Sequence, residues 1–382
     1  MKLAATLLCL SAIVVSASGC ARGLNGPALS TEPGPSPRPL DELAVNERRA
    51  ILDRAQVWRP INTAALDLLA GPPGAGRFAF DGPVRCAFSY PEKPLTGVTP
   101  KFECEVAPGD VVKVKYGDSN GEVFAEVAAS RLFWALGFGA DRMYPVKVTC
   151  VNCPLDPHVV STTEWHLGKP ASLRTLVFDP ATIERRFDGE PVEVKGFEGW
   201  SWRELEAVAD NEVGATRAHI DALKLLAAFV QHVDSKPENQ ALVCTDATPR
   251  RDARGNSTCA QPLLIVKDLG STFAAAKKFA FPKMKLESWR SVPVWKDERR
   301  CQANLTSSLV GTLAHPEISE SGRQFLAGRL QLLSDDQLRA LFTAARVERR
   351  KDNIQGRQVT PDDWVRVFKE KRAAIVAHRC AT

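Results

Sequence analysis

Apolar runs separated by turn residues occupy most of residues 78–148 and predict a set of short strands. A largely apolar run at residues 122–136 predicts a helix, because capping candidates precede it at 118–120 and Gly137 follows it. A shorter helix is predicted around residues 40–55. The predicted strands are residues 84–90, 101–106, 111–116 and 144–150, with Pro-Gly-Asp at 108–110 as the turn between the second and third.

After residue 201 the chain becomes predominantly helical in pattern. Residues 216–230 predict a buried helix with a polar stripe, and the apolar runs at 240–243 and 263–266 predict two strands behind it. A strand-rich half before a helix-rich half predicts an α+β fold with two lobes. Capping signals mark three further helix starts, at Ser201 with Glu204, at Ser334 with Gln337, and at Thr360 before Pro361.

The composition is that of a folded globular protein of 382 residues, with 44% hydrophobic and 25% charged residues. It excludes wholesale disorder and a polytopic membrane protein. Fifty basic residues against forty-five acidic ones leave a formal net charge of +5. Over this length the excess creates no strong field for nucleic acid or anionic lipid, so we expect no nucleic-acid partner.

The first twenty residues have the pattern of a bacterial export signal. Lys2 precedes an apolar run at residues 3–15, which is too short to span a bilayer but is typical of a signal-peptide core. The following Ala-Ser-Gly-Cys, residues 17–20, resembles the lipobox of bacterial lipoproteins, in which the cysteine is acylated after cleavage. We therefore expect a lipoprotein signal at residues 1–19 and lipidation of Cys20. A plain secretory signal that happens to end in cysteine is the alternative.

A proline-rich segment, residues 20–45, follows the cysteine and predicts an extended tether between membrane and body. Ala21, rather than Asp, follows the acylated position, and in lipoprotein sorting this favours the outer membrane. The expected location is the bacterial cell envelope, with the folded body in the periplasm or on the cell surface. Membrane contact is expected through the lipid anchor only.

Export changes the interpretation of the cysteines. Apart from Cys9 and Cys20 the chain has eight, and an even number in an oxidising compartment predicts disulfides. Eight cysteines allow about 105 pairings, so the connectivity stays open, although local spacing favours one set. The Cys-x-x-Cys at residues 150–153 could instead be redox-active or half of a zinc site, but a second such pair and a thioredoxin-like context are missing. The favoured pairs are Cys86 with Cys104, Cys150 with Cys153, Cys244 with Cys259, and Cys301 with Cys380.

The residues after the buried helix at 216–230 carry the clearest candidate chemistry. Asp234, on a loop, can accept a proton from an attacking hydroxyl, and Lys236 can neutralise charge on a phosphate. Asn239 offers a hard carbonyl ligand for Mg²⁺, and Asp268, after the strand at 263–266, offers a carboxylate for the same metal. Gly270 is expected to let the chain turn sharply beside it. A base, a lysine and two metal ligands are the parts that phosphoryl transfer needs.

This segment resembles the catalytic loop of protein kinases, H-R-D-x-K-P-x-N, followed by D-F-G. The resemblance implies that His232 is a structural residue that holds the backbone, and not a general base. An ordinary helix-to-strand turn is the alternative explanation for Asp234 and Asn239. The matching positions are His232, Asp234, Lys236, Pro237 and Asn239, with Asp-Leu-Gly at 268–270 in place of D-F-G.

A kinase-like site also requires a strand lysine that contacts nucleotide phosphates and a helix glutamate that pairs with it. Val-Lys-Val-Lys at 112–115 resembles the Val-Ala-Ile-Lys strand of the family and indicates Lys115, with Lys113 on the same strand face as the alternate. Glu126 lies on a mainly apolar helix face and is the expected partner. Glu122, in the first turn, is interpreted as a helix-dipole residue.

The sequence also departs from the protein-kinase pattern. No G-x-G-x-x-G loop lies between the first two strands; Gly97, Thr99 and Lys101 occupy that place and could contact phosphate instead. This is closer to atypical and lipid-kinase-like phosphotransferases. Val233 replaces the arginine that reads a phosphorylated activation loop in many kinases, so that form of control is not expected.

These features together predict a nucleotide-binding N-lobe at residues 46–196 and a catalytic C-lobe at 197–382. The leading hypothesis is an exported, lipid-anchored, kinase-like phosphotransferase that uses Mg²⁺ and ATP, or another nucleoside triphosphate, on an unknown acceptor. The alternatives are a catalytically inactive pseudokinase and a disulfide-stapled envelope binding lipoprotein.

Overall fold

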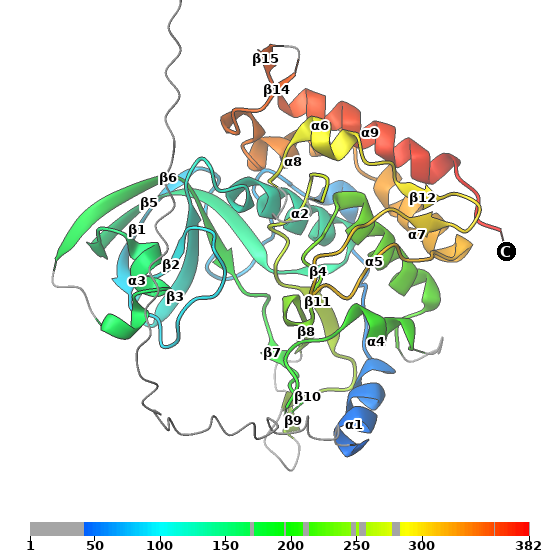
Figure 1. Cartoon of the computed structure of the whole chain (residues 1–382), viewed down its shortest axis with the longest axis horizontal. Coiled ribbons are helices and arrows are strands. Elements are labelled where there is room, and N and C mark those ends of the chain that lie inside the picture. Colours follow the sequence, from blue (N-terminus) through cyan, green and yellow to red (C-terminus); the bar gives the residue numbers. More distant parts are fainter. Residues whose placement is uncertain are drawn as a thin grey trace, which may run out of the picture. The chain divides into compact units, whose positions relative to one another are not determined.

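A computed structural model describes residues 42–168, 172–194, 196–208, 214–245, 250–251, 257–276, 283–354 and 356–381. They form a mixed α+β body with a strand-rich part and a helical part (Figure 1). The predicted signal, Cys20 and most of the tether lie outside these residues. Among the helices that the structure describes, none combines the length and apolar character needed to cross a bilayer.

Five strands of the N-terminal half close into a barrel, in the order β1-β2-β3-β6-β5. Neighbouring strands are antiparallel except β1 and β5, which run parallel. Four of the strands lie where they were predicted; β6, which pairs with both β3 and β5, was not predicted. The strands are β1 (Gly82–Ser89), β2 (Lys101–Ala107), β3 (Asp110–Tyr116), β5 (Arg142–Pro154) and β6 (Leu173–Arg185).

The barrel has its own apolar core, which includes Phe102, Val114, Val146 and Ile183. Two of the predicted disulfides reinforce its wall. Cys86 pairs with Cys104 across β1 and β2, and Cys150 pairs with Cys153 within β5. The other predicted pairs, Cys244 with Cys259 and Cys301 with Cys380, are also confirmed, with Cα–Cα distances of 5.5–5.7 Å in all four.

Helix α2 (Glu122–Leu136) has the bounds that the apolar run predicts. Gly137 ends it at a left-handed φ of 90°, and a side chain there would lie 2.3 Å from the carbonyl oxygen of Arg59. The expected cap is different in detail. Gly121 takes the N-cap position, and the side chain of Asn120 accepts a hydrogen bond from the Glu122 N–H.

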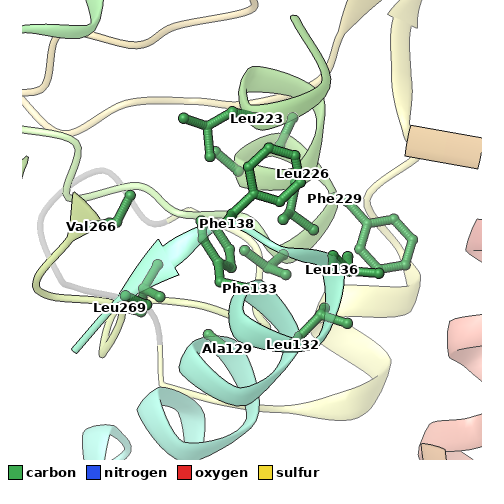
Figure 2. Close-up of a cluster of buried hydrophobic side chains, with 14 of the residues drawn as sticks. Ala129, Leu132, Phe133, Leu136, Phe138, Leu223, Leu226, Phe229, Val266 and Leu269 are labelled. Atoms are coloured by element: carbon green, nitrogen blue, oxygen red, sulfur yellow. The ribbon is translucent and has the colours of Figure 1, made fainter. Parts of the chain in front are cut away.

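Almost every residue of α2 is buried, because the helix contacts the barrel strands β3, β5 and β6 and also joins the core of the helical part. Figure 2 shows the place where α2 meets α5 (Arg217–Val230) and the end of β11 (Leu263–Val266). The side chains labelled there are Ala129, Leu132, Phe133, Leu136, Phe138, Leu223, Leu226, Phe229, Val266 and Leu269.

The helical part contains a small sheet of order β4-β11-β8-β7, and three of its helices begin at the three predicted capping signals. The polar stripe of α5 is buried, since Asp221 pairs with Lys224 at 2.8 Å and accepts a hydrogen bond from Ser319. The larger elements are α1 (Glu42–Leu52), α4 (Trp202–Glu206), β8 (Gln240–Cys244), α6 (Leu286–Arg290), α7 (Glu320–Gln331), α8 (Asp335–Ala344) and α9 (Pro361–Ala377).

Short elements connect these. They are η1 (Thr63–Ala65), β4 (Gly139–Ala140), α3 (Pro157–Ser161), η2 (Trp165–Leu167), β7 (Glu190–Pro191), η3 (Pro237–Asn239), β9 (Arg250–Arg251), β10 (Ser257–Thr258), β12 (Trp295–Asp297), β13 (Gln302–Ala303), η4 (Val347–Arg349), β14 (Asn353–Ile354) and β15 (Arg357–Gln358).

Candidate active site

Lys115 and Glu126 form a buried ion pair between β3 and α2. The Nζ–Oε2 distance is 2.6 Å, and the two side chains are 3% and 1% exposed. Lys115 faces α2 because Val112 and Val114, on the alternate face of the strand, fill the barrel. The alternate candidate, Lys113, lies on the same face but pairs with Glu184 at 2.6 Å. The structure therefore favours Lys115 over Lys113 as the partner of Glu126.

Two more carboxylates surround the Lys115 ammonium. Glu122 lies 3.2 Å from it and Glu184 lies 3.7 Å from it. Burial opposes the charged form, but Glu126 and Asp268, with these two glutamates, raise the pKa of Lys115 well above its usual value. The interpretation of Glu122 as only a helix-dipole residue is therefore wrong, because the α2 turn brings it to the same ammonium as Glu126.

Asp268 follows β11 and completes this group of charges. Burial acts to raise its pKa, but the Lys115 ammonium, the Gly270 N–H and Lys113 lower it well below the ordinary value. Gly270 does not have a left-handed backbone, so its predicted role in a sharp turn does not come from a positive φ. Glycine lets this segment lie close to Glu122, because a Cβ at position 270 would lie 2.5 Å from Cγ of Glu122.

Asp234 and Asn239 lie together on the loop between α5 and β8. The Asn239 amide donates to the Asp234 backbone oxygen at 2.7 Å and to its Oδ2 at 3.2 Å. Lys236 Nζ lies 3.6 Å from the same Oδ2. Burial raises the pKa of Asp234, Lys236 lowers it, and the negative charge of Asp268 raises it further. The two aspartates are thus close enough for one charge to affect the other.

A backbone hydrogen bond ties this loop to the segment that carries Asp268. The Lys267 N–H donates to the Asn239 carbonyl oxygen at 2.8 Å. Two further bonds run between the loop region and the chain after Gly270, from Val233 N–H to Ser271 O and from Phe273 N–H to Val230 O. The two motifs, about thirty residues apart in sequence, are therefore neighbours.

His232 is structural, but not in the predicted way. It is completely buried, and burial lowers its pKa to about 4, so the ring is neutral. Neither ring nitrogen has a hydrogen-bond partner among the described residues, so the side chain does not hold the backbone there. Its ring instead packs near that of Trp202, with centroids 6.3 Å apart.

The loop before β2 reaches the Lys115 group. Thr99 donates its hydroxyl to Glu122 Oε2 at 3.0 Å. Burial lowers the pKa of Lys101, and the charge of Lys115 lowers it further, while Glu122 and Asp268 act in the opposite direction. Gly97 has a left-handed φ of 87°, and a Cβ there would lie 2.9 Å from the Lys101 ammonium. Thr99 and Lys101 therefore lie near the charged group around Lys115, and Gly97 lies next to Lys101.

One part of the candidate site was missed by the sequence reasoning: residues 307–313, which support the loop at 232–239. Ser308 N–H donates to the Val233 oxygen at 2.8 Å, and Thr312 N–H donates to the Ser235 oxygen at 3.0 Å. The Ser235 hydroxyl lies 3.1 Å from that of Ser307 and accepts from the Leu313 N–H. These contacts link positions more than seventy residues apart, and no local sequence signal could have indicated them.

The residues present fit a hard cation such as Mg²⁺. The Asn239 amide nitrogen is engaged with Asp234, so the carbonyl oxygen of the side chain is the atom left for a cation. The low pKa of Asp268 keeps its carboxylate charged, and Glu126 Oε1 is a buried oxygen without a hydrogen-bond partner within the described ranges. Carboxylate and amide oxygens with free lone pairs are the ligands that Mg²⁺ prefers.

Comparisons with known proteins add little to this geometry. No protein-family model matches the chain, and no curated protein shows significant similarity to it. Among solved structures, the chain is similar to a Helicobacter pylori proinflammatory kinase, CtkA, with 8% identity and a TM-score of 0.40. That alignment covers 76% of this chain and 94% of the other. A likeness at this level carries no argument about fold or function.

Proposed function

We propose that this chain is a protein-kinase-like phosphotransferase, which moves a phosphoryl group from a Mg-nucleoside triphosphate, ATP or another, to an acceptor hydroxyl. The observation that carries the proposal is the buried Lys115–Glu126 pair at 2.6 Å, with Asp268 acting on the same ammonium. A strand lysine paired with a helix glutamate, beside a metal-binding aspartate, is the arrangement that kinase catalysis requires.

Each residue has a definite part in this proposal. Lys115, with Thr99 and Lys101, binds the phosphates, and Asp268 and Asn239 hold Mg²⁺. The bound metal neutralises charge that develops on the transferring phosphoryl group. Asp234 orients and deprotonates the acceptor through Oδ1, which is buried and has no partner among the described residues. Lys236, 3.6 Å from Asp234, neutralises charge as the phosphoryl group approaches.

Two isosteric variants test the roles of the aspartates. Asp234→Asn should lower turnover by roughly 10²–10⁴-fold and leave the nucleotide-dependent thermal shift intact, because a base acts only on the reacting proton. Asp268→Asn should lose the Mg-nucleotide shift itself, because the cation joins protein and phosphates.

The wild-type protein decides between the proposal and its alternatives. Phosphate transfer to an acceptor, or hydrolysis of the nucleotide, supports the phosphotransferase. A nucleotide-dependent shift without turnover would support the pseudokinase. No shift with any nucleotide, with Mg²⁺ or Mn²⁺, would contradict nucleotide use and support a binding lipoprotein.

We infer that the body is exported and anchored through Cys20 in the bacterial envelope. Four disulfides support this inference, because they persist in oxidising compartments. Titration of the unfolded, unreduced protein should find almost no free thiol. Metabolic labelling with a fatty acid should mark the wild-type protein and not Cys20→Ser, and labelling of neither would contradict the anchor.

A further inference from the structure

Three carboxylates converge at the junction of α2 and the segment after β11. Glu122, Glu126 and Asp268 each offer one oxygen, and these oxygens lie within 4.8 Å of one another. Two oxygens on opposite sides of one ion are separated by twice the metal–oxygen distance, or about 4.2 Å for Mg²⁺ and about 5 Å for Ca²⁺. The spacing therefore allows one divalent cation to contact all three side chains.

The unsatisfied oxygen of Glu126 is the second observation at this place. The side chain is 1% exposed and pairs with Lys115 through Oε2. Its Oε1 is buried and has no hydrogen-bond partner among the residues that the structure describes. A buried carboxylate oxygen is costly without a partner, and a cation would satisfy it.

The charges around the junction are also compatible with a bound cation. Lys115 is surrounded by four carboxylates, Glu122, Glu126, Glu184 and Asp268. Lys113 and Lys101 are ammonium groups that also act on this set. A divalent cation would add positive charge to this mainly acidic group, which suits the approach of nucleotide phosphates.

We propose that Glu122, Glu126 and Asp268 form a binding site for a divalent, oxygen-preferring cation, with the Lys115 ammonium in this place when the metal is absent. This site combines Asp268 with two residues of α2, whereas the pair named under the proposed function combines Asp268 with Asn239 of the loop at 232–239. The inference rests on the proposed function for the role of the metal, but metal binding itself requires no nucleotide. Glu122 is the residue that distinguishes it from the Asp268–Asn239 pair.

The test uses Mn²⁺ as the probe, with the metal-depleted, nucleotide-free protein and electron paramagnetic resonance of the free ion. Wild-type protein should bind one Mn²⁺, and Glu122→Gln should weaken this binding by at least roughly tenfold, because affinity follows the number of charged ligands. Lys115→Met should tighten it, because the ammonium and the metal compete for the same oxygens.

Glu105→Gln is the matched control, since Glu105 is an exposed carboxylate of the same barrel. The side chain of Glu122 is 17% exposed and glutamine has the same shape, so the unfolding temperature should confirm that Glu122→Gln is folded.

Wild-type affinity in Glu122→Gln, or no Mn²⁺ bound by either wild-type protein or Lys115→Met, overturns the inference. If the nucleotide-dependent thermal shift persists in that case, the proposed function is not contradicted. If Mn²⁺ binding depends on Glu122 but no nucleotide causes a thermal shift, the proposed function is contradicted and the metal site is not.

Discussion

Lys115 and Arg346 are both buried cations that join the barrel to other parts of the chain, but their partners differ in kind. Lys115 is held by side-chain carboxylates of α2 and β6. Arg346, just after α8, donates to the carbonyl oxygens of Ala181 and Val146 at 2.6 and 3.3 Å. Burial lowers the pKa of Arg346 to about 10, and Asp81 partly opposes this, so the guanidinium stays charged at neutral pH.

The two kinds of partner, backbone carbonyls for Arg346 and carboxylate side chains for Lys115, suit the two cations to different roles. Carbonyl oxygens of a barrel strand are fixed by the sheet, so Arg346 is a structural clamp with no alternative arrangement. The guanidinium presents several donors in a fixed plane, which suits backbone acceptors. Carboxylate side chains can rotate and can exchange an ammonium for a metal, and the released ammonium can then pair with a phosphate. A group of this second kind is suited to binding ligands.

The largest stability effect is expected for Lys115→Met. Breaking a buried pair on one side leaves uncompensated charge, and the free energy of unfolding should fall by about 3–5 kcal/mol at pH 7. The remaining carboxylates then have pKa values above those of the unfolded chain, so the folded state binds protons more tightly. Stability should therefore recover as the pH falls. Urea unfolding at pH 5 and pH 8 measures this, and an equal loss at both pH values would contradict it.

A smaller and pH-independent loss is expected for Arg346→Met. It removes the 2.6 Å hydrogen bond to the Ala181 oxygen, which costs about 1–3 kcal/mol, and the 3.3 Å contact with Val146 adds little. Because no carboxylate of the Lys115 group is involved, the loss should be the same at pH 5 and pH 8. Arg349→Met is the control, since its pair with Asp179 is one-third exposed and should contribute no more than about 1 kcal/mol.

The pH dependence of turnover tests Lys236. Asp234 must be deprotonated to act as a base, and its pKa is raised by burial while Lys236 lowers it. Lys236→Met should raise this pKa further, so the acid limb of the kcat/KM profile should move to higher pH. Profiles normalised to their plateau separate this shift from a general loss of rate. An unmoved acid limb would mean that Asp234 is not the titrating base.

The smallest effect is expected for Thr99→Val, which removes the hydroxyl that donates to Glu122. The loss of one partly exposed hydrogen bond should lower the free energy of unfolding by about 0.5–1.5 kcal/mol. Thr96→Val, on an exposed position of the same loop, should have no such effect. Equal values for the two variants would show that the Thr99–Glu122 contact does not stabilise the loop.

Sequence reasoning succeeded where the signal is local. The bounds of α2 followed from an apolar run and Gly137, which is needed because that position is left-handed and crowded by the Arg59 oxygen. The pairing of Lys115 with Glu126 was expected from the resemblance to the protein-kinase strand and from the apolar helix face around Glu126, and it is confirmed. The predicted disulfides were confirmed, including the long-range pair of Cys301 and Cys380, which remained once the local pairs were made.

The tertiary structure alone decided the roles that depend on distant neighbours. Strand β6 closes the barrel between β3 and β5, Arg346 reaches across to its carbonyl oxygens, and residues 307–313 support the loop at 232–239. Glu122 and Gly270 gained their roles only when α2 and the chain after β11 came into contact. Local sequence determines which backbone conformation a segment prefers, whereas burial and charge compensation depend on what packs against it. For this protein the individual residues of the proposed site could be read from the sequence, and the cluster of carboxylates around Lys115 could not.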